Sequence, residues 1–176
     1  MIQLYTGDGK GKTTAAIGLA VRAAGRDFRV YFAQFMKGND TGELYSLRKL
    51  PNVKILRSEK NFGFYSSMSD ADKRELTEIH NEILNDLIRA VESGCCDLLV
   101  MDEITYPVNW NLLDREKLER LLELCGCGDA DWQPEIVMTG RNAPDFLWKR
   151  ADYITEMQSR RHPYDRGIQA RRGIEF

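Results

Sequence analysis

Short apolar runs along this chain alternate with longer stretches in which apolar residues recur at helical spacing. The short runs are rich in branched and aromatic residues and predict strands at residues 2–5, 29–35, 53–57, 97–103, 135–139 and 152–157. The helical spacing predicts helices at residues 13–25 and 43–49, longer helices after Ser69 and Asp114, and a short helix after Pro144. This alternation predicts an α/β fold with a mostly parallel sheet of about six strands and helices on both faces.

Several of the expected helix ends carry sequence signals of their own. Ser69 and Asp72 have the spacing of a capping box, and Asp114 is a good N-cap for the helix that follows it. Gly25 and Gly94 come directly after periodic apolar stretches, where glycine commonly ends a helix. No internal repeat or low-complexity linker interrupts the sequence, so we expect residues 1–176 to form one domain.

A glycine-rich turn separates the first predicted strand from the first predicted helix. It reads Thr6-Gly7-Asp8-Gly9-Lys10-Gly11-Lys12-Thr13-Thr14, and its second half matches the Walker A pattern G-x-x-x-x-G-K-[ST]. Thr6 replaces the first glycine of that pattern, so Gly7 and Gly9 supply the flexibility. Backbone N–H groups of such a turn, together with the positive end of the next helix, bind phosphate. We therefore expect a P-loop NTPase-like (RecA or Rossmann-like) fold; the alternative is a glycine-rich turn that binds nothing.

Side chains of this turn add chemistry to the phosphate-binding backbone. Lys12 can reach phosphates as a point charge, and the Thr13 hydroxyl can ligate Mg²⁺. The expected nucleotide-binding residues are Gly7, Asp8, Gly9, Lys10, Gly11, Lys12, Thr13 and Thr14.

Two acidic residues end the fourth predicted strand. Residues 97–103 form an apolar run that finishes in Asp102 and Glu103, and a buried parallel strand delivers such carboxylates to its carboxyl end. Beside a phosphate loop this is a Walker B motif, in which either acid can hold Mg²⁺ directly or through water. The sequence leaves open which acid lies closer, and a strand followed by an acidic turn is the alternative.

Further candidate site segments follow other predicted strands. The polar loop 36–43 follows the second strand at the edge where ligands bind in open α/β sheets. Arg141 follows the fifth strand and is expected either to face phosphates or to form a surface salt bridge.

The loop 58–68 is expected either to form a wall for a large flat ligand or to be pinned to the core. Its aromatic residues are Phe62, Phe64 and Tyr65. The arginine-rich tail is expected to order around a polyanion or to stay solvated.

Composition and charge exclude several classes of protein. The chain of 176 residues is 43% apolar and 30% charged with a net charge of −2, which is ordinary for a globular protein and argues against a general nucleic-acid binder. No apolar run approaches the ~20 residues of a membrane span, and no signal region precedes the first strand. We therefore expect a cytoplasmic protein with no nucleic-acid or membrane partner.

Its cysteines lack zinc-site spacing and are predicted to be reduced, partly buried thiols: Cys95, Cys96, Cys125 and Cys127.

Four blocks of the sequence resemble a known family. They are Thr6–Ala16, Asp102–Tyr106, Thr139–Arg141 with Ala143–Pro144, and His162–Phe176, of which the last is the most distinctive. Over nearly its whole length the chain resembles the P-loop family of ATP:corrinoid adenosyltransferases of cobalamin synthesis and salvage, which act on cob(I)yrinic acid a,c-diamide or cob(I)alamin.

The resemblance implies a reaction and roles for matching residues. The family transfers the 5′-deoxyadenosyl group of ATP to the cobalt(I) of a reduced corrinoid and releases triphosphate. ATP lies reversed in the P-loop, so that its C5′ faces the corrinoid. Carried over by motif, Gly7 to Thr13 bind the triphosphate, Thr13 and Glu103 hold Mg²⁺ with Asp102 beside them, and the expected catalytic residues are Lys12, Thr13 and Arg141.

The resemblance also implies how the corrinoid is bound. Phe62 and Phe64 are the candidates to lie below the corrin ring, where aromatic side chains displace the lower axial ligand and ease reduction to cobalt(I). The family commonly forms homodimers, and a flavoprotein is the expected reductant. The segment 158–176 is expected to wrap the active site. Many relatives have an N-terminal extension over that site; because this sequence begins at the first strand, we expect a corrinoid site that is more open or is closed by a partner subunit.

Two other functions are compatible with the motifs. The first is an ATP-dependent kinase or NTPase that cleaves the β–γ phosphate bond. The second is a non-catalytic corrinoid carrier that uses ATP only as a binding signal. The guanine-reading N-K-x-D motif is absent, so the sequence favours ATP over GTP in each case.

Overall fold

The structure of this chain, a computed structural model, describes residues 1–126 and 133–175. Its strands are β1 (Ile2–Thr6), β2 (Val30–Gln34), β3 (Val53–Arg57), β4 (Leu98–Asp102), β5 (Glu135–Thr139) and β6 (Tyr153–Glu156). Its helices are α1 (Lys12–Ala24), α2 (Gly42–Leu47), α3 (Asp70–Glu92), α4 (Thr105–Asn109), α5 (Arg115–Gly126) and α6 (Asp145–Arg150). Two short 3-10 helices are η1 (Tyr65–Ser67) and η2 (Pro163–Arg166). The α/β class predicted from the apolar pattern is confirmed.

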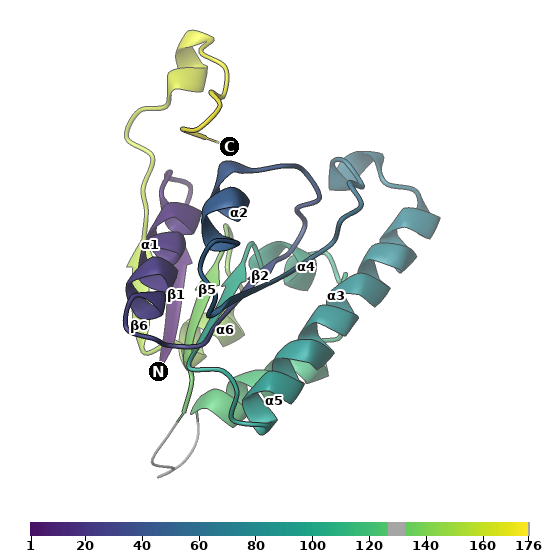
Figure 1. Cartoon of the computed structure of the whole chain (residues 1–176). Coiled ribbons are helices and arrows are strands. Elements are labelled where there is room, and N and C mark those ends of the chain that lie inside the picture. Colours follow the sequence, from purple (N-terminus) through teal and green to yellow (C-terminus); the bar gives the residue numbers. More distant parts are fainter. Residues whose placement is uncertain (127–132, 176) are drawn as a thin grey trace.

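The six strands form one parallel sheet in the order β3-β2-β4-β5-β1-β6 (Figure 1). The carboxyl ends of parallel strands all lie at the same end of the sheet, called its carboxyl edge here. The segments that follow β2, β4, β5 and β1 therefore emerge there as neighbours. The pairing register places Gln34 of β2 beside Asp102 of β4, and Thr139 of β5 beside Tyr5 of β1. The topology therefore gathers the phosphate loop, both acids and Arg141 at one edge.

Apolar side chains fill both faces of this sheet. On one face, Ala16 and Ala20 of α1 and Leu47 of α2 pack against β2, β4 and β5. The small alanines let α1 lie close to the sheet, which holds its first turn near the end of β1. On the other face, α3, α5 and α6 cover the sheet with residues such as Leu84 and Leu118. The expected helices on both faces are confirmed (Figure 1).

The predicted helix ends are also present. Ser69 Oγ accepts a hydrogen bond from Asp72 N at 3.2 Å, and Asp72 Oδ2 accepts one from Ser69 N at 3.1 Å, which completes the capping box of α3. Asp114 Oδ1 accepts from Glu116 N at 3.0 Å at the start of α5. Gly94, with φ of 64°, follows the end of α3. The short helix α4 was not predicted, because five residues are too few to establish a helical period.

The structure describes three of the four cysteines. Cys96 and Cys125 are buried and Cys95 is exposed, and all three are free. Burial raises the pKa of both buried thiols to about 12. Cys127 and Phe176 lie outside the described residues. Among the helices that the structure describes, none combines the length and the apolar character needed to cross a membrane.

Candidate active site

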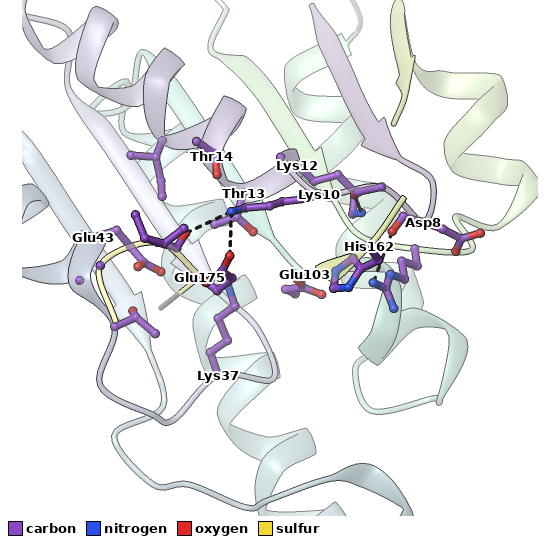
Figure 2. A pocket seen from close by; sticks show the side chains of 18 of the residues that line it. Asp8, Lys10, Lys12, Thr13, Thr14, Lys37, Glu43, Glu103, His162 and Glu175 are labelled. Carbon is purple, nitrogen blue, oxygen red and sulfur yellow. Dashed lines mark hydrogen bonds and ion pairs between the residues drawn. The ribbon is translucent and has the colours of Figure 1, made fainter. Parts of the chain in front are cut away.

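A cavity of about 770 Å³ lies at the carboxyl edge of the sheet. The phosphate loop and the first turns of α1 line it, together with the segments that follow β2, β4 and β5 and the end of the chain. Figure 2 shows Lys12, Thr13, Lys37 and Glu103 in this cavity, although they come from three different parts of the sheet. The volume falls within the range of about 300–1,000 Å³ typical of small-molecule sites.

The phosphate loop is held in shape by the segment that follows β6. Gly7 and Gly11 have φ of 92° and 116°, which side chains rarely adopt. A Cβ atom on Gly7 would lie 2.5 Å from Met157 O, and one on Gly9 would lie 2.7 Å from the same oxygen. Gly9 N donates a hydrogen bond to Met157 O at 2.6 Å, and Met157 N donates to Thr6 O at 2.8 Å. Gly7 and Gly9 are therefore required for close packing against Met157, directly after β6, a role beyond the phosphate binding predicted from the sequence.

Lys12 begins α1, and its ammonium group lies over the loop. Its Nζ donates hydrogen bonds to Gly7 O at 2.6 Å and to Gly9 O at 2.7 Å. Burial lowers the pKa of Lys12, and the positive charge of Arg141 lowers it further. The ammonium group is therefore desolvated and held by neutral carbonyl groups. An anionic ligand would be a stronger partner for it than these carbonyls.

Asp102, at the end of β4, is the hub of a buried hydrogen-bond network. It is fully buried, and its Oδ1 accepts hydrogen bonds from Thr13 Oγ1 at 2.8 Å and from Thr139 Oγ1 at 2.7 Å. Its Oδ2 lies 2.7 Å from Lys37 Nζ. Burial alone would lower the pKa of Lys37, but the charge and hydrogen bond of Asp102 outweigh burial and raise it. Side chains from α1, from β5 and from the segment after β2 therefore meet at the carboxylate that ends β4.

Glu103 extends from the same strand end toward the cavity. Its backbone is left-handed, with φ of 63°, and its N–H donates to Thr139 Oγ1 at 3.0 Å. Burial raises the pKa of Glu103, and the neighbouring charge of Asp102 adds to this effect. Glu103 lines the cavity, whereas the Asp102 side chain lies beneath it against Thr13. The two acids that the sequence left equivalent thus have different surroundings.

Arg141 follows β5 and also lines the cavity. Gly140 before it has φ of 146°, and a Cβ at this position would lie 1.9 Å from Thr105 Oγ1. Thr105 Oγ1 donates to Arg141 O at 2.7 Å, and Arg141 Nη2 donates to Asp8 O at 3.4 Å. A buried threonine and an obligatory glycine therefore fix the backbone of Arg141 beside the phosphate loop.

The aromatic loop behaves differently at its two candidate positions. Phe62 is partly buried against the cluster that contains Met68 and Leu76, whereas Phe64 is 84% exposed. Neither is among the described residues that line the cavity. Phe62 thus fits the interpretation that the loop is pinned to the core, whereas contact of the exposed Phe64 with a large flat ligand stays a prediction.

A stack of aromatic rings, which was not predicted from the sequence, links this loop to the cavity. The Tyr65 ring is stacked on Trp110 at a centroid distance of 4.4 Å, and the Trp110 ring lies 5.0 Å from Tyr106. Tyr106 lines the cavity. Tyr65 and Trp110 are 45 positions apart in the sequence, so only the fold could have brought them together.

The end of the chain returns to the phosphate loop. In Figure 1 the segment after β6 extends beyond the carboxyl edge of the sheet, and Gly173, Ile174 and Glu175 line the cavity. Lys10 Nζ lies 3.3 Å from Glu175 Oε1, the contact drawn in Figure 2, and 3.4 Å from Ile174 O. Arg171 also forms an ion pair with Glu175, at 3.0 Å. The family resemblance implied that this segment lies at the active site.

The oxygen donors at the cavity fit a magnesium ion shared with phosphates. Within residues 1–126 and 133–175, no group of three His, Cys, Asp or Glu side chains is placed to hold a metal ion. Thr13 and Glu103 both offer oxygen atoms to the cavity, and Asp102 lies directly behind Thr13. Mg²⁺ is typically bound in this way, by one or two protein oxygens together with substrate phosphates and water.

A parallel sheet with a phosphate loop after β1 and a buried acid at the end of β4 defines a P-loop nucleotide-binding protein. Within that class, the chain belongs to the family described as ATP:corrinoid adenosyltransferase BtuR/CobO/CobP, whose sequence model matches residues 1–176.

Individual relatives carry the same name. The chain is 28% identical over 176 residues to a corrinoid adenosyltransferase of Escherichia coli K12, an alignment that spans 100% of this chain and 85% of the relative. It is 31% identical over 189 residues to a corrinoid adenosyltransferase of a Sinorhizobium species, spanning 100% and 80%. With one of Pseudomonas aeruginosa the identity is 29% over 182 residues, spanning 100% and 83%. The protein is therefore an enzyme of the corrinoid adenosyltransferase type.

Proposed function

We propose that this protein transfers the 5′-deoxyadenosyl group of ATP to the cobalt(I) of a reduced corrinoid and releases triphosphate. The observation that carries the proposal is the convergence of the phosphate loop, Lys12 and the Thr13–Asp102 hydrogen bond on one cavity. These groups are suited to binding a polyanion and stabilising its charge. Family membership supplies the corrinoid as the second substrate.

The proposed reaction is a displacement at carbon that balances without a proton transfer. Cobalt(I) donates an electron pair to C5′ of ATP and becomes a cobalt–alkyl centre, formally cobalt(III). The C5′–O5′ bond breaks, and its electron pair leaves with the triphosphate. The enzyme must therefore present C5′ to cobalt and stabilise the negative charge that accumulates on the leaving group.

Residues of the phosphate loop and of β5 provide that stabilisation. Lys12 exchanges its carbonyl partners for phosphate oxygens, and the N–H groups at the start of α1 point to the same anion. Arg141, whose backbone is fixed by Gly140 and Thr105, adds a second positive charge at the cavity wall. Charge stabilisation by such fixed groups is commonly the largest single contribution to catalysis.

Thr13 and Glu103 would hold Mg²⁺ at the phosphates, and Asp102 would orient Thr13. A bound Mg²⁺ supplies positive charge to the triphosphate. Thr13 already donates its hydroxyl proton to Asp102, so its lone pairs are available to a cation on the cavity side. The raised pKa of Glu103 reflects its burial and the charge of Asp102, which a cation would offset.

The corrinoid would bind at the mouth of the cavity. A cavity of about 770 Å³ accommodates a nucleotide but not a corrin ring in addition. Phe64, which is 84% exposed, is the better candidate to contact the corrin ring and displace its lower ligand, because Phe62 is partly buried in the loop anchor. A homodimer, a flavoprotein reductant and closure of segment 158–176 over the nucleotide complete the proposal.

The proposal is tested by anaerobic incubation of the protein with ATP, Mg²⁺ and chemically reduced cobalamin. A product with the visible spectrum of an alkylcobalt corrinoid, which light converts back to a non-alkylated form, is expected. An unchanged corrinoid under these conditions would overturn the proposal. The Lys12→Ala variant serves as the matched control for adventitious alkylation, because it lacks the ammonium group that neutralises the leaving triphosphate.

A further inference from the structure

The backbone that follows β2 is held in an unusual conformation. Phe35 N donates a hydrogen bond to Asp102 O at 2.9 Å, which continues the pairing of β2 with β4 by one residue. Met36 then adopts a left-handed backbone, with φ of 57°. Its N–H donates to His80 Nε2 at 3.4 Å, while His80 Nδ1 lies 2.8 Å from Leu112 O. Nδ1 therefore carries the ring proton, and the buried histidine supports the turn at Met36.

A close backbone approach constrains the same turn from the other side. A Cβ on Gly38 would lie 2.2 Å from Lys60 O, so no other residue fits at this position. Lys37 thus stands between a left-handed residue and an obligatory glycine. Left-handed residues other than glycine or asparagine are uncommon and cost conformational energy. Such a cost at a turn is consistent with a functional requirement for the direction of the Lys37 side chain.

The Lys37 side chain points into the nucleotide cavity. Its Nζ lies 2.7 Å from Asp102 Oδ2, and the side chain is 25% exposed. Within the part of the chain that the structure describes, this is its one hydrogen bond, so two of its three N–H donors remain for a ligand. Figure 2 shows Lys37 and Lys12 entering the cavity from different elements.

The charges that line the cavity explain why a second lysine is needed. The described lining residues include Lys10, Lys12, Lys37 and Arg141, and they also include four acids: Asp8, Glu43, Glu103 and Glu175. The opposite charges balance, and Lys10 is paired with Glu175. Without Lys37, the described lining residues would carry one more negative than positive charge, so its ammonium group, which Asp102 holds in position, makes the cavity less repulsive to a triphosphate.

We propose that Lys37 is a second triphosphate-binding lysine, which contacts ATP phosphates together with Lys12. As the C5′–O5′ bond breaks, its ammonium group stays protonated and stabilises the electron pair that leaves with the triphosphate. Asp102 acts as a positioning residue that holds Lys37 and Thr13 on its two oxygens. The role in the reaction rests on the proposed function; the role in phosphate binding does not.

The binding role is tested without corrinoid, by calorimetric titration with inorganic triphosphate in the presence of EDTA. Lys37→Met is expected to weaken triphosphate binding at least tenfold and to leave the weak binding of adenosine within twofold. The matched control is Lys54→Met, which removes the same charge from the exposed surface of β3 and is expected to change neither affinity more than twofold. Equal triphosphate affinities for Lys37→Met and Lys54→Met would overturn the proposal.

A double-mutant cycle separates phosphate binding from neutralisation of Asp102. If Lys37 only compensates the buried carboxylate, its removal costs nothing once Asp102→Asn has removed that charge. If Lys37 contacts phosphate, Lys37→Met in the Asp102→Asn background still weakens triphosphate binding at least threefold, a smaller effect than in the wild-type background because Asp102 no longer positions the ammonium group. The background also restores folding if the single Lys37→Met variant is unstable, because no unpaired buried charge remains.

The outcome is independent of the proposed reaction. Loss of triphosphate binding in both backgrounds supports the role of Lys37 even if no corrinoid is adenosylated. The opposite outcome has two parts: the wild-type protein transfers adenosyl groups, and Lys37→Met leaves the triphosphate affinity of the Asp102→Asn background unchanged. That outcome overturns the role of Lys37 and leaves the proposed function standing.

Discussion

Thr13 Oγ1 donates a hydrogen bond to Asp102 Oδ1 at 2.8 Å, although the two residues are 89 positions apart in the chain. This contact joins the first turn of α1 to the end of β4 and fixes the hydroxyl group at the phosphate loop. It places the proposed metal-binding oxygen and the buried acid in one network.

Thr13→Val should slow the magnesium-dependent step while preserving the fold. Asp102 keeps its hydrogen bond from Thr139 and its ion pair with Lys37, so the folded state loses one of three partners. We expect adenosyl transfer to fall by about 100-fold, the typical cost of removing one fixed charge-stabilising group. The measurement is the rate as a function of Mg²⁺ concentration. Thr13→Ser, which retains the hydroxyl, should stay within about threefold of wild type; equal rates for Val and Ser would contradict the assignment.

Lys12→Ala should remove activity without unfolding the protein. The ammonium group is desolvated and bonded to carbonyls, so its loss relieves an unfavourable burial. We expect the rate of adenosyl transfer to fall by about 100-fold or more and the thermal midpoint to change little. Activity and thermal unfolding should be measured on the same sample. A variant that remains fully active would rule out Lys12 as a phosphate-binding residue.

Gly140→Ala should destabilise the protein and displace Arg141. The new Cβ would meet Thr105 Oγ1 at 1.9 Å and would occupy a backbone with φ of 146°. We expect a loss of about 2–3 kcal/mol in the free energy of unfolding, within the range for strained backbone positions. Urea denaturation measures this loss. Gly18→Ala, at an exposed position in α1 with nothing within 4 Å of the new Cβ, should instead raise stability by about 1 kcal/mol.

The two phenylalanines of the aromatic loop should separate in their effects. Phe64→Ala should leave stability unchanged, because Phe64 is 84% exposed, and should slow adenosylation of a corrinoid that carries a lower axial ligand more than of one that lacks it. Phe62→Ala should lower the thermal midpoint, because Phe62 packs against Met68 and Leu76. The measurements are rates with both corrinoids and thermal unfolding. Equal losses on both corrinoids for Phe64→Ala would exclude ligand displacement.

His80 should make stability depend on pH. Burial lowers its pKa from 6.5 to about 4, so between these values the unfolded state binds more protons than the folded state. Its contribution is complete above pH 6.5 and is lost as the pH falls toward 4, by about 2 kcal/mol at pH 5 and about 3 kcal/mol in total. Denaturation of wild type and His80→Gln at pH 7.5 and pH 5 isolates this residue. The same pH dependence in both proteins would show that His80 is not buried in its neutral form.

The fold was predictable because its signals are local. Each buried strand is a short apolar run, and Ser69 and Asp114 cap helices through contacts within four residues. The phosphate loop and the acids of β4 were found for the same reason, since each motif is contiguous. Parallel topology then implied that their carboxyl ends meet.

The rest of the site depends on contacts between distant segments. Lys37 was noticed only as part of a polar loop, because nothing near it indicates that it reaches Asp102, 65 positions away. Thr139 belongs to one of the blocks that resemble the family, but its contact with Asp102, 37 positions away, was not predicted. The stack of Tyr65 on Trp110 also joins residues that are far apart in the sequence, so local patterns could not predict it. Packing of Gly7 and Gly9 against Met157 shows that a motif glycine can serve the scaffold as much as the ligand.

The most direct test of the account identifies the phosphate product in the anaerobic reaction of ATP with reduced corrinoid. Phosphorus NMR of the quenched mixture should show one equivalent of inorganic triphosphate for each photolabile adenosylated corrinoid formed. This result would establish that the bond between C5′ and the triphosphate oxygen breaks in the reaction. ADP and orthophosphate in place of triphosphate, with the corrinoid unchanged, would contradict the account and indicate a kinase or NTPase that cleaves the β–γ bond.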